Sequence, residues 1–171
     1  MDTDKNRFKH KEITEKIIGV FYEVYNELGH GFLESVYEKS LEVAFNSMGL
    51  RVCRQIEIPV SFRGQRVGIF TADMLVEDCV LLELKAARAL DSAHQAQLLN
   101  YLRATEIEVG LVLNFGLKPE FKRLIFDNPR KLSRGTPGIS VADLLIPTLR
   151  LTSPQISLLC LIRVLSVFIC G

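Results

Sequence analysis

The chain has 171 residues, enough for one domain with a sizeable core, or one domain followed by a tail. Hydrophobic residues make up 48% and charged residues 24%, as in an ordinary globular protein, and a net charge of +1 gives no global sign of nucleic-acid binding, although a local basic patch would suffice. The four cysteines show no metal-binding spacing. The first residues, "MDTDKNRFKHKE", are too polar for a signal peptide, so we expect the protein to reside in the reducing cytoplasm.

Two amphipathic helices are predicted for the first part of the chain. Apolar residues recur at steps of three and four over residues 11–28, and "GHGF" at 29–32 interrupts this pattern. The same spacing returns over about residues 33–48, and Gly49 is a plausible residue to follow the helix end.

Three strands are predicted next, because the period changes from helical spacing to alternation. Apolar residues fall on even positions over residues 52–62, and "RGQ" at 63–65 can turn the chain. Residues 66–76 and 80–86 then form the second and third strands, with "EDC" between them. Such short turns predict an antiparallel meander.

A helix over residues 91–104 and a buried strand over 109–115 complete the predicted elements, and "PEFKRLIFDN" closes the region without an assigned element. The order α-α-β-β-β-α-β predicts an α/β or α+β fold with a central mixed sheet flanked by helices.

The composition changes near residue 129, which we take as a domain boundary. Residues 1–128 carry a net charge of −3, whereas residues 129–171 carry +4 and include the linker-like "SRGTPG" at 133–138. We therefore expect a domain at 1–128 and a linker with an apolar, basic tail at 129–171. The apolar run after Pro154 is about 16 residues long and contains Arg163, so a helix packed on the domain or on a partner is favoured over a membrane span.

Three charged residues interrupt the predicted sheet. Glu83 and Lys85 are two positions apart and share one face of the third strand, and a short turn would place Asp73 beside Glu83. Two carboxylates side by side destabilise a sheet unless a positive charge offsets them. Lys85 supplies one such charge, and Mg²⁺ or Mn²⁺, which prefer carboxylate oxygens, would supply two.

A second interpretation of these three residues needs no function. An Asp, a Glu and a Lys near a hairpin more often form a solvated rim with a surface ion pair. Taken alone, the three residues favour this interpretation.

Further motifs favour a functional site. Asp73, then nine residues, then Glu83-Leu84-Lys85 resembles the PD-(D/E)XK nuclease signature, with Ala72 in place of its first proline. "GFLESVY" at 31–37 and "HQAQLLNYLR" at 94–103 appear in the order found in the GxxExxY protein family, a branch of that superfamily. The resemblance spans about residues 10–128 and implies an α-βββ-αβ core.

The resemblance also implies roles for individual residues. Asp73 and Glu83 would hold Mg²⁺ or Mn²⁺, Lys85 would assist the attacking water, and Glu34 would complete the metal site. Gln97 would support the site together with Tyr101, as in the QxxxY element of related nucleases.

Three of the candidate residues, Glu34, Tyr37 and His94, have simpler explanations that stay open. Glu34 also suits the positive end of a helix dipole, and Tyr37 also suits core packing with a bonded hydroxyl. His94 is equally a hydrogen-bonded helix residue, and Arg88 is a candidate phosphate contact.

We therefore expect a Mg²⁺-dependent protein that hydrolyses phosphodiester bonds in nucleic acid, with DNA as the expected substrate. The alternative is a nucleic-acid- or protein-binding module on the same fold with little or no catalysis. A homodimer is a further possible assembly.

Overall fold

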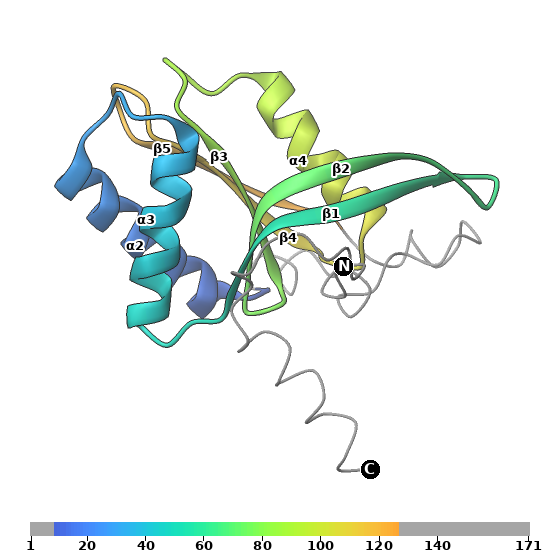
Figure 1. Ribbon diagram of the computed structural model, residues 1–171, viewed down its shortest axis with the longest axis horizontal. Coiled ribbons are helices and arrows are strands. Elements are labelled where there is room, and N and C mark those ends of the chain that lie inside the picture. The colour runs from blue at the N-terminus through green and yellow to red at the C-terminus, as the bar shows by residue number, and fades with distance from the viewer. Residues whose placement is uncertain (1–8, 127–171) are drawn as a thin grey trace, which may run out of the picture.

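A five-stranded sheet with helices on both faces forms the protein in a computed structural model that describes residues 9–126 (Figure 1). The predicted tail at 129–171 lies outside the described residues, so the boundary at residue 128 stays a prediction. None of the helices within residues 9–126 is long and apolar enough to cross a membrane. The elements are α2 (Lys11–Leu28), α3 (Glu34–Ser47), β1 (Val52–Phe62), β2 (Gln65–Val76), β3 (Val80–Lys85), α4 (Ser92–Ala104), β4 (Val109–Asn114) and β5 (Glu120–Ile125).

The sheet is mixed, with the spatial order β1-β2-β3-β4-β5. The pairs β1–β2, β2–β3 and β4–β5 are antiparallel, and β3–β4 is parallel. The predicted meander and the mixed α+β fold are therefore confirmed. The parallel pair needs a crossover, and α4 provides it.

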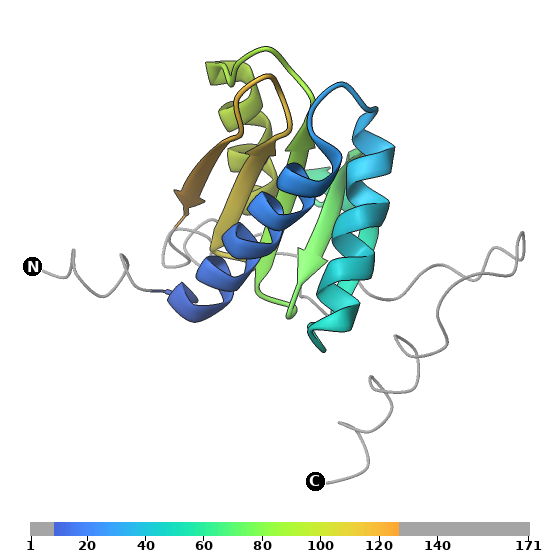
Figure 2. The same ribbon diagram turned by 90° about the vertical axis from the view of Figure 1, so that its left-hand side faces the viewer.

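Each face of the sheet is covered by its own hydrophobic core. Figure 2 shows α2 and α3 on one side of the sheet and α4 on the other. The first core joins α2 and α3 residues such as Phe21 and Leu41 to Leu82 and Leu84 of β3. The second joins Leu98 of α4 to Leu81 of β3 and Val112 of β4. Side chains alternate along β3, so those at even positions face α2 and α3. Those at odd positions, including Glu83 and Lys85, face the side of α4.

The strand β5 was not predicted. Its six residues alternate only partly between exposed and intermediate positions. Phe121 packs on the first core while Leu124 packs on the second, so this edge strand has no single apolar face. A short, charged edge strand with apolar residues on both faces lacks the periodicity that identifies a strand from sequence.

Strands β2 and β3 separate early, and this separation positions the charged residues. Their pairing covers only Val76–Val80, Leu75–Leu81 and Met74–Leu82, whereas β3 stays paired with β4 as far as Lys85–Asn114. The last three residues of β3 therefore extend beyond the β2 ladder. Strand β1 has an unusual backbone at the same level, because Gln55 adopts a left-handed conformation (φ 53°) between the Arg54–Met74 and Ile56–Ala72 pairs.

Candidate active site

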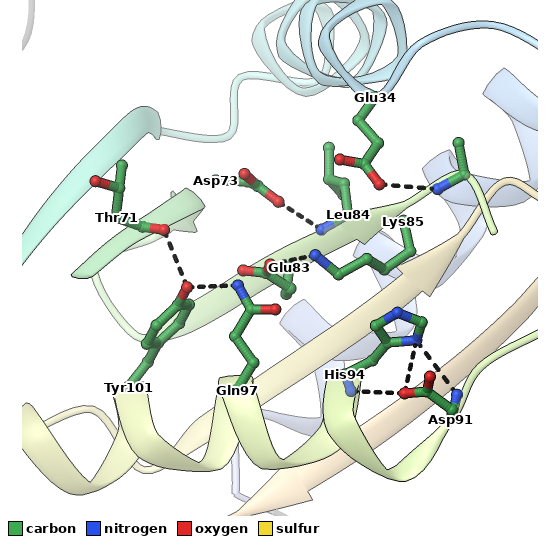
Figure 3. Close-up of polar contacts among 11 residues, drawn as sticks. Glu34, Thr71, Asp73, Glu83, Leu84, Lys85, Asp91, His94, Gln97 and Tyr101 are labelled. Atoms are coloured by element: carbon green, nitrogen blue, oxygen red, sulfur yellow. Dashed lines mark hydrogen bonds and ion pairs between the residues drawn. The ribbon is translucent and has the colours of Figure 1, made fainter.

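Asp73 and Glu83 lie where β2 and β3 separate. Met74–Leu82 is the last residue pair between the two strands, and the next residue outward is Asp73 on β2 and Glu83 on β3. Figure 3 shows the Asp73, Glu83 and Lys85 side chains together, with Glu34 of α3 on one side and Gln97 and Tyr101 of α4 on the other. The structure thus brings together the five residues proposed as catalytic from the sequence.

The carboxylate of Asp73 replaces a missing backbone partner. Its Oδ2 accepts a hydrogen bond from the Leu84 backbone N–H at 2.7 Å, beyond the point where the β2 backbone pairs with β3 (Figure 3). Burial raises the pKa of Asp73, although this hydrogen bond and the charge of Lys85 act in the opposite direction. The side chain is therefore fixed in orientation and partly withdrawn from water.

Glu83 is a buried carboxylate with one oxygen satisfied and one not. Its side chain is only 3% exposed, and its Oε1 accepts a 2.7 Å ion-paired hydrogen bond from Lys85 Nζ. The second oxygen, Oε2, is buried without a hydrogen-bond partner. Burial and the neighbouring charge of Asp73 raise the pKa of Glu83 to about 7. A buried carboxylate oxygen without a partner is costly, so it indicates a position for a ligand.

Lys85 completes the charged group on β3. Burial acts to lower its pKa, but the ion pair with Glu83 outweighs burial, and the net effect is a raised pKa. The ammonium therefore stays charged at neutral pH. The two carboxylates together with Lys85 still leave a net negative charge at full ionisation.

The donors of this group fit a hard divalent cation. Asp73 and Glu83 offer carboxylate oxygens, one of them the buried Oε2 atom without a partner. Within residues 9–126, no three His, Cys, Asp or Glu side chains form a cluster ready to hold a metal. Mg²⁺ commonly binds through only one or two carboxylates and keeps several waters, so two protein ligands suit this ion.

Glu34 lies over the end of β3. It is the first residue of α3, and its Oε1 accepts a hydrogen bond from the Ala86 backbone N–H at 3.2 Å. Its charge contributes to the raised pKa of both Asp73 and Glu83. Glu34 thus adds negative potential to the site while its carboxylate is engaged with the backbone one residue beyond Lys85.

Gln97 and Tyr101 connect α4 to β2. Gln97 Nε2 donates to the Tyr101 hydroxyl at 2.7 Å, and that hydroxyl donates to the Thr71 backbone carbonyl at 3.2 Å. Thr71 is two residues before Asp73. Burial raises the pKa of Tyr101, and the charges of Glu83 and Asp73 add to this shift. The pair therefore braces the strand that carries Asp73.

The other three candidates have different surroundings. His94 takes part in a capping box at the start of α4, where its Nδ1 accepts from the Asp91 N–H and the Asp91 carboxylate accepts from the His94 N–H. Arg88 is exposed in the segment between β3 and α4. Tyr37 is buried and stacks on Phe115 with ring centroids 4.1 Å apart.

The sequence did not identify a polar network that contacts the left-handed residue of β1. Glu38 is only 6% exposed, and it accepts hydrogen bonds from Arg54 at 2.7 Å and from Gln55 at 3.0 Å. Gln55 is the left-handed residue at the level of Asp73, and the charge of Glu38 helps to raise the pKa of Asp73. One signal was present: Glu38 follows Tyr37 and precedes Leu41 by three positions, so it borders the apolar face of α3.

The sequence also missed the residues that hold the chain after Lys85. Buried Asn114 donates to the Ala87 carbonyl and accepts from the Ala87 N–H, while Phe115 N–H donates to the Lys85 carbonyl at 2.7 Å. Gly116 follows so closely that a Cβ there would lie 1.9 Å from the Ala87 carbonyl oxygen. The absence of a side chain at Gly116 is what permits this approach.

We therefore expect Gly116→Ala to destabilise the protein by about 3 kcal/mol, because the backbone after Lys85 must move to relieve the clash. Denaturant unfolding measures the loss. Gly68→Ala is the matched control, since a Cβ at Gly68 would meet nothing within 4 Å. Equal unfolding midpoints for the two variants would show that the segment after Lys85 is not held as tightly as described.

Comparisons with known proteins place the chain in a family. Residues 11–124, about two thirds of the chain, match the model of the PD-(D/E)XK nuclease superfamily. Among solved structures, the crystal structure of SSO0001 is similar over 58% of this chain and 54% of that chain, with 16% identity and a TM-score of 0.41. The search of curated proteins returned no match. On the match over residues 11–124, the chain belongs to the PD-(D/E)XK nuclease superfamily.

Proposed function

We propose that the protein hydrolyses phosphodiester bonds in nucleic acid, with DNA as the expected substrate, and that it requires Mg²⁺ or Mn²⁺. One observation carries the proposal: the buried Glu83 Oε2 has no hydrogen-bond partner and lies in a group that also contains Asp73 and Lys85. A structural ion pair would satisfy its buried oxygens, whereas a metal site keeps one available.

Asp73 and Glu83 are the residues that would hold the ion. When bound, a divalent cation supplies positive charge for the transition state and a water molecule of lowered pKa. The hydrogen bond from Leu84 N–H fixes Asp73, and Lys85 fixes Glu83, so the two carboxylates need little rearrangement. Charged groups that are already held in place need little reorganisation energy when the reaction occurs.

The remaining residues orient the substrate and the site. Lys85 Nζ stays charged and would stabilise the negative charge that develops on the phosphate, or orient the attacking water. Gln97 and Tyr101 hold β2 through the Thr71 carbonyl. Glu34 would add negative charge to the site that holds the ion.

Within the superfamily, we assign the chain to the GxxExxY branch. Its pattern of Gly31, Glu34 and Tyr37 has a physical explanation, because the Tyr37 hydroxyl donates to the Gly29 carbonyl and accepts from the Phe32 N–H. These bonds fix the loop before α3, and that loop sets the position of Glu34 over Ala86. Gly31 suits the loop since its φ is 104°.

A cleavage assay separates this function from that of a binding module. Purified protein is incubated with single-stranded, double-stranded and branched DNA and RNA in Mg²⁺, in Mn²⁺ and in chelator. We expect cleavage of at least one substrate only with metal, and none by Asp73→Ala. Nucleic-acid binding without metal-dependent cleavage of any substrate would instead support the binding module.

A further inference from the structure

The hairpin of β1 and β2 extends beyond the rest of the sheet as a two-stranded ribbon (Figure 1). Its outer part consists of residues 58–70, from the Ile58–Phe70 pair outward, and is here named the arm; the exposed Glu57 lies just before it. The first seven residues of β2, from Gln65 to Thr71, are all exposed, so both faces of this strand contact solvent. Isolated two-stranded ribbons are only marginally stable in water, so a bound partner that covers the arm would stabilise it.

The arm carries positive charge and exposed apolar side chains. It contains Arg63 and Arg66 and no acidic residue. Phe62 and Val67 are each 62% exposed, and the Arg63 guanidinium lies 5.2 Å from the centre of the Phe62 ring. Arginine beside an aromatic ring is suited to a phosphate backbone and to the bases or sugars next to it.

The arm is connected to the candidate active site at its base. Phe70 lies 5.4 Å, ring to ring, from Tyr101, whose hydroxyl donates to the Thr71 carbonyl. Asp73 follows two residues later on the same strand. A ligand that lies along the arm is thereby directed to the position where β2 and β3 separate.

The distance along the strand sets where the arm would touch the substrate. Arg66 is seven residues from Asp73, or roughly 23 Å at the rise of a β-strand. Successive phosphates of one strand of a duplex lie about 3.4 Å apart along the axis, so this distance spans roughly seven base pairs. A two-stranded ribbon also fits the width of a duplex major groove.

A second copy of the chain fits the arm less well. Symmetric dimers bring the same surface of both copies together, so an interface between two arms would gather Arg63 and Arg66 of both copies with no acid on either arm to neutralise them. A nucleic-acid duplex supplies the missing negative charge. The charge of the arm therefore favours a duplex over self-association.

We propose that the arm binds a nucleic-acid duplex through phosphate contacts from Arg63 and Arg66. These contacts lie roughly seven base pairs from the phosphate that reacts at Asp73 and Glu83. The proposal builds on the function proposed above, because it assigns the reacting phosphate to that site. The arm then sets the length of duplex that the protein engages.

The test measures duplex binding by the full chain in chelator, where cleavage does not interfere. Fluorescence anisotropy of a labelled DNA duplex of about 20 base pairs gives the affinity between about 50 and 200 mM salt. Each phosphate contact contributes about 0.9 to the slope of log affinity against log salt. We expect the slope of the Arg63→Ala/Arg66→Ala double variant to be shallower than that of wild type by about 2. The affinity of wild type should then fall about tenfold more over this range than that of the variant.

The control variant is Lys16→Ala/Lys39→Ala, which removes the same charge from exposed positions on α2 and α3. Its slope should equal that of wild type, and thermal melts check that all three proteins are folded. Equal slopes for the arm variant and wild type, or no duplex binding by wild type at low salt, would overturn the proposal. Light scattering that shows a smaller assembly for the arm variant, with an unchanged slope, would assign the arm to a second copy.

Cleavage is scored separately in Mn²⁺ with the same duplex, so that the two proposals fail independently. A reduced slope for the arm variant, in a wild type that cleaves neither this duplex nor any substrate of the cleavage assay above, would support the arm and contradict the proposed hydrolysis. Cleavage by wild type with an unchanged slope for the arm variant would support hydrolysis and contradict the arm.

Discussion

Glu83→Ala is expected to reduce metal-dependent cleavage to background, a loss on the order of 10³-fold or more. The substitution removes the buried Oε2 atom and the partner of Lys85 together. A bound metal contributes several kcal/mol of charge stabilisation in the transition state, and about 4 kcal/mol corresponds to 10³-fold in rate. Single-turnover cleavage in Mg²⁺ and in Mn²⁺ measures the effect.

The matched control is Glu57→Ala, which removes an exposed carboxylate from β1. It should cleave at the wild-type rate within a factor of about two, as expected for a surface substitution away from the site. Circular dichroism confirms that both variants are folded. Wild-type activity in rigorously purified Glu83→Ala would exclude this carboxylate from the reaction and with it the proposed site.

The second large effect concerns stability and pH in the absence of metal. The pKa of Glu83 is about 7 in the folded protein, against an ordinary value of 4.5. Below pH 4.5 both the folded and the unfolded states hold this proton. Between 4.5 and 7 the unfolded state releases the proton while the folded state keeps it, so the free energy of unfolding falls as pH rises. The fall amounts to about 3 kcal/mol and is complete near pH 8.

The side chain in the Glu83→Gln variant cannot ionise. The free energy of unfolding of this variant should therefore not show the fall that Glu83 causes in wild type as pH rises. In chelator at about pH 8 it should therefore be more stable than wild type by up to about 3 kcal/mol, and near pH 4 the two should be alike. Asp73→Asn should change stability in the same direction, because burial also raises the pKa of Asp73. The pH dependence of denaturant unfolding tests both variants. Parallel profiles for wild type and Glu83→Gln would show that Glu83 is solvated, as the surface-rim interpretation requires.

The main elements follow from sequence periodicity, because burial on one face imposes a local pattern. Helix α2 has the predicted bounds, Lys11–Leu28, and the first strand has the predicted bounds, Val52–Phe62. The placement of Asp73 beside Glu83 follows from the short turn at residues 77–79, since a three-residue loop between Val76 and Val80 fixes the register.

The sequence could not predict how the sheet opens at the site. The left-handed Gln55 lies at the same level as that opening, and it contacts Glu38, which is 17 residues away in sequence. Gly116, on the segment beside the end of β3, lies close to Ala87 only in the folded chain. Helical spacing places Glu38 at the border of the apolar face of α3, but contacts between distant segments leave no periodic signal, so its partner Arg54 is revealed only by the structure.

The central claim is that Asp73 and Glu83 hold a divalent cation, and Mn²⁺ binding tests it most directly. Electron paramagnetic resonance of free Mn²⁺ gives the affinity for wild type, Asp73→Asn, Glu83→Gln and the control Glu57→Gln. We expect one site of similar affinity in wild type and in Glu57→Gln, and at least about tenfold weaker binding in each of the other two, since each loses a charged ligand. Equal Mn²⁺ affinities in all four proteins, or no binding by wild type at millimolar Mn²⁺, would contradict the account.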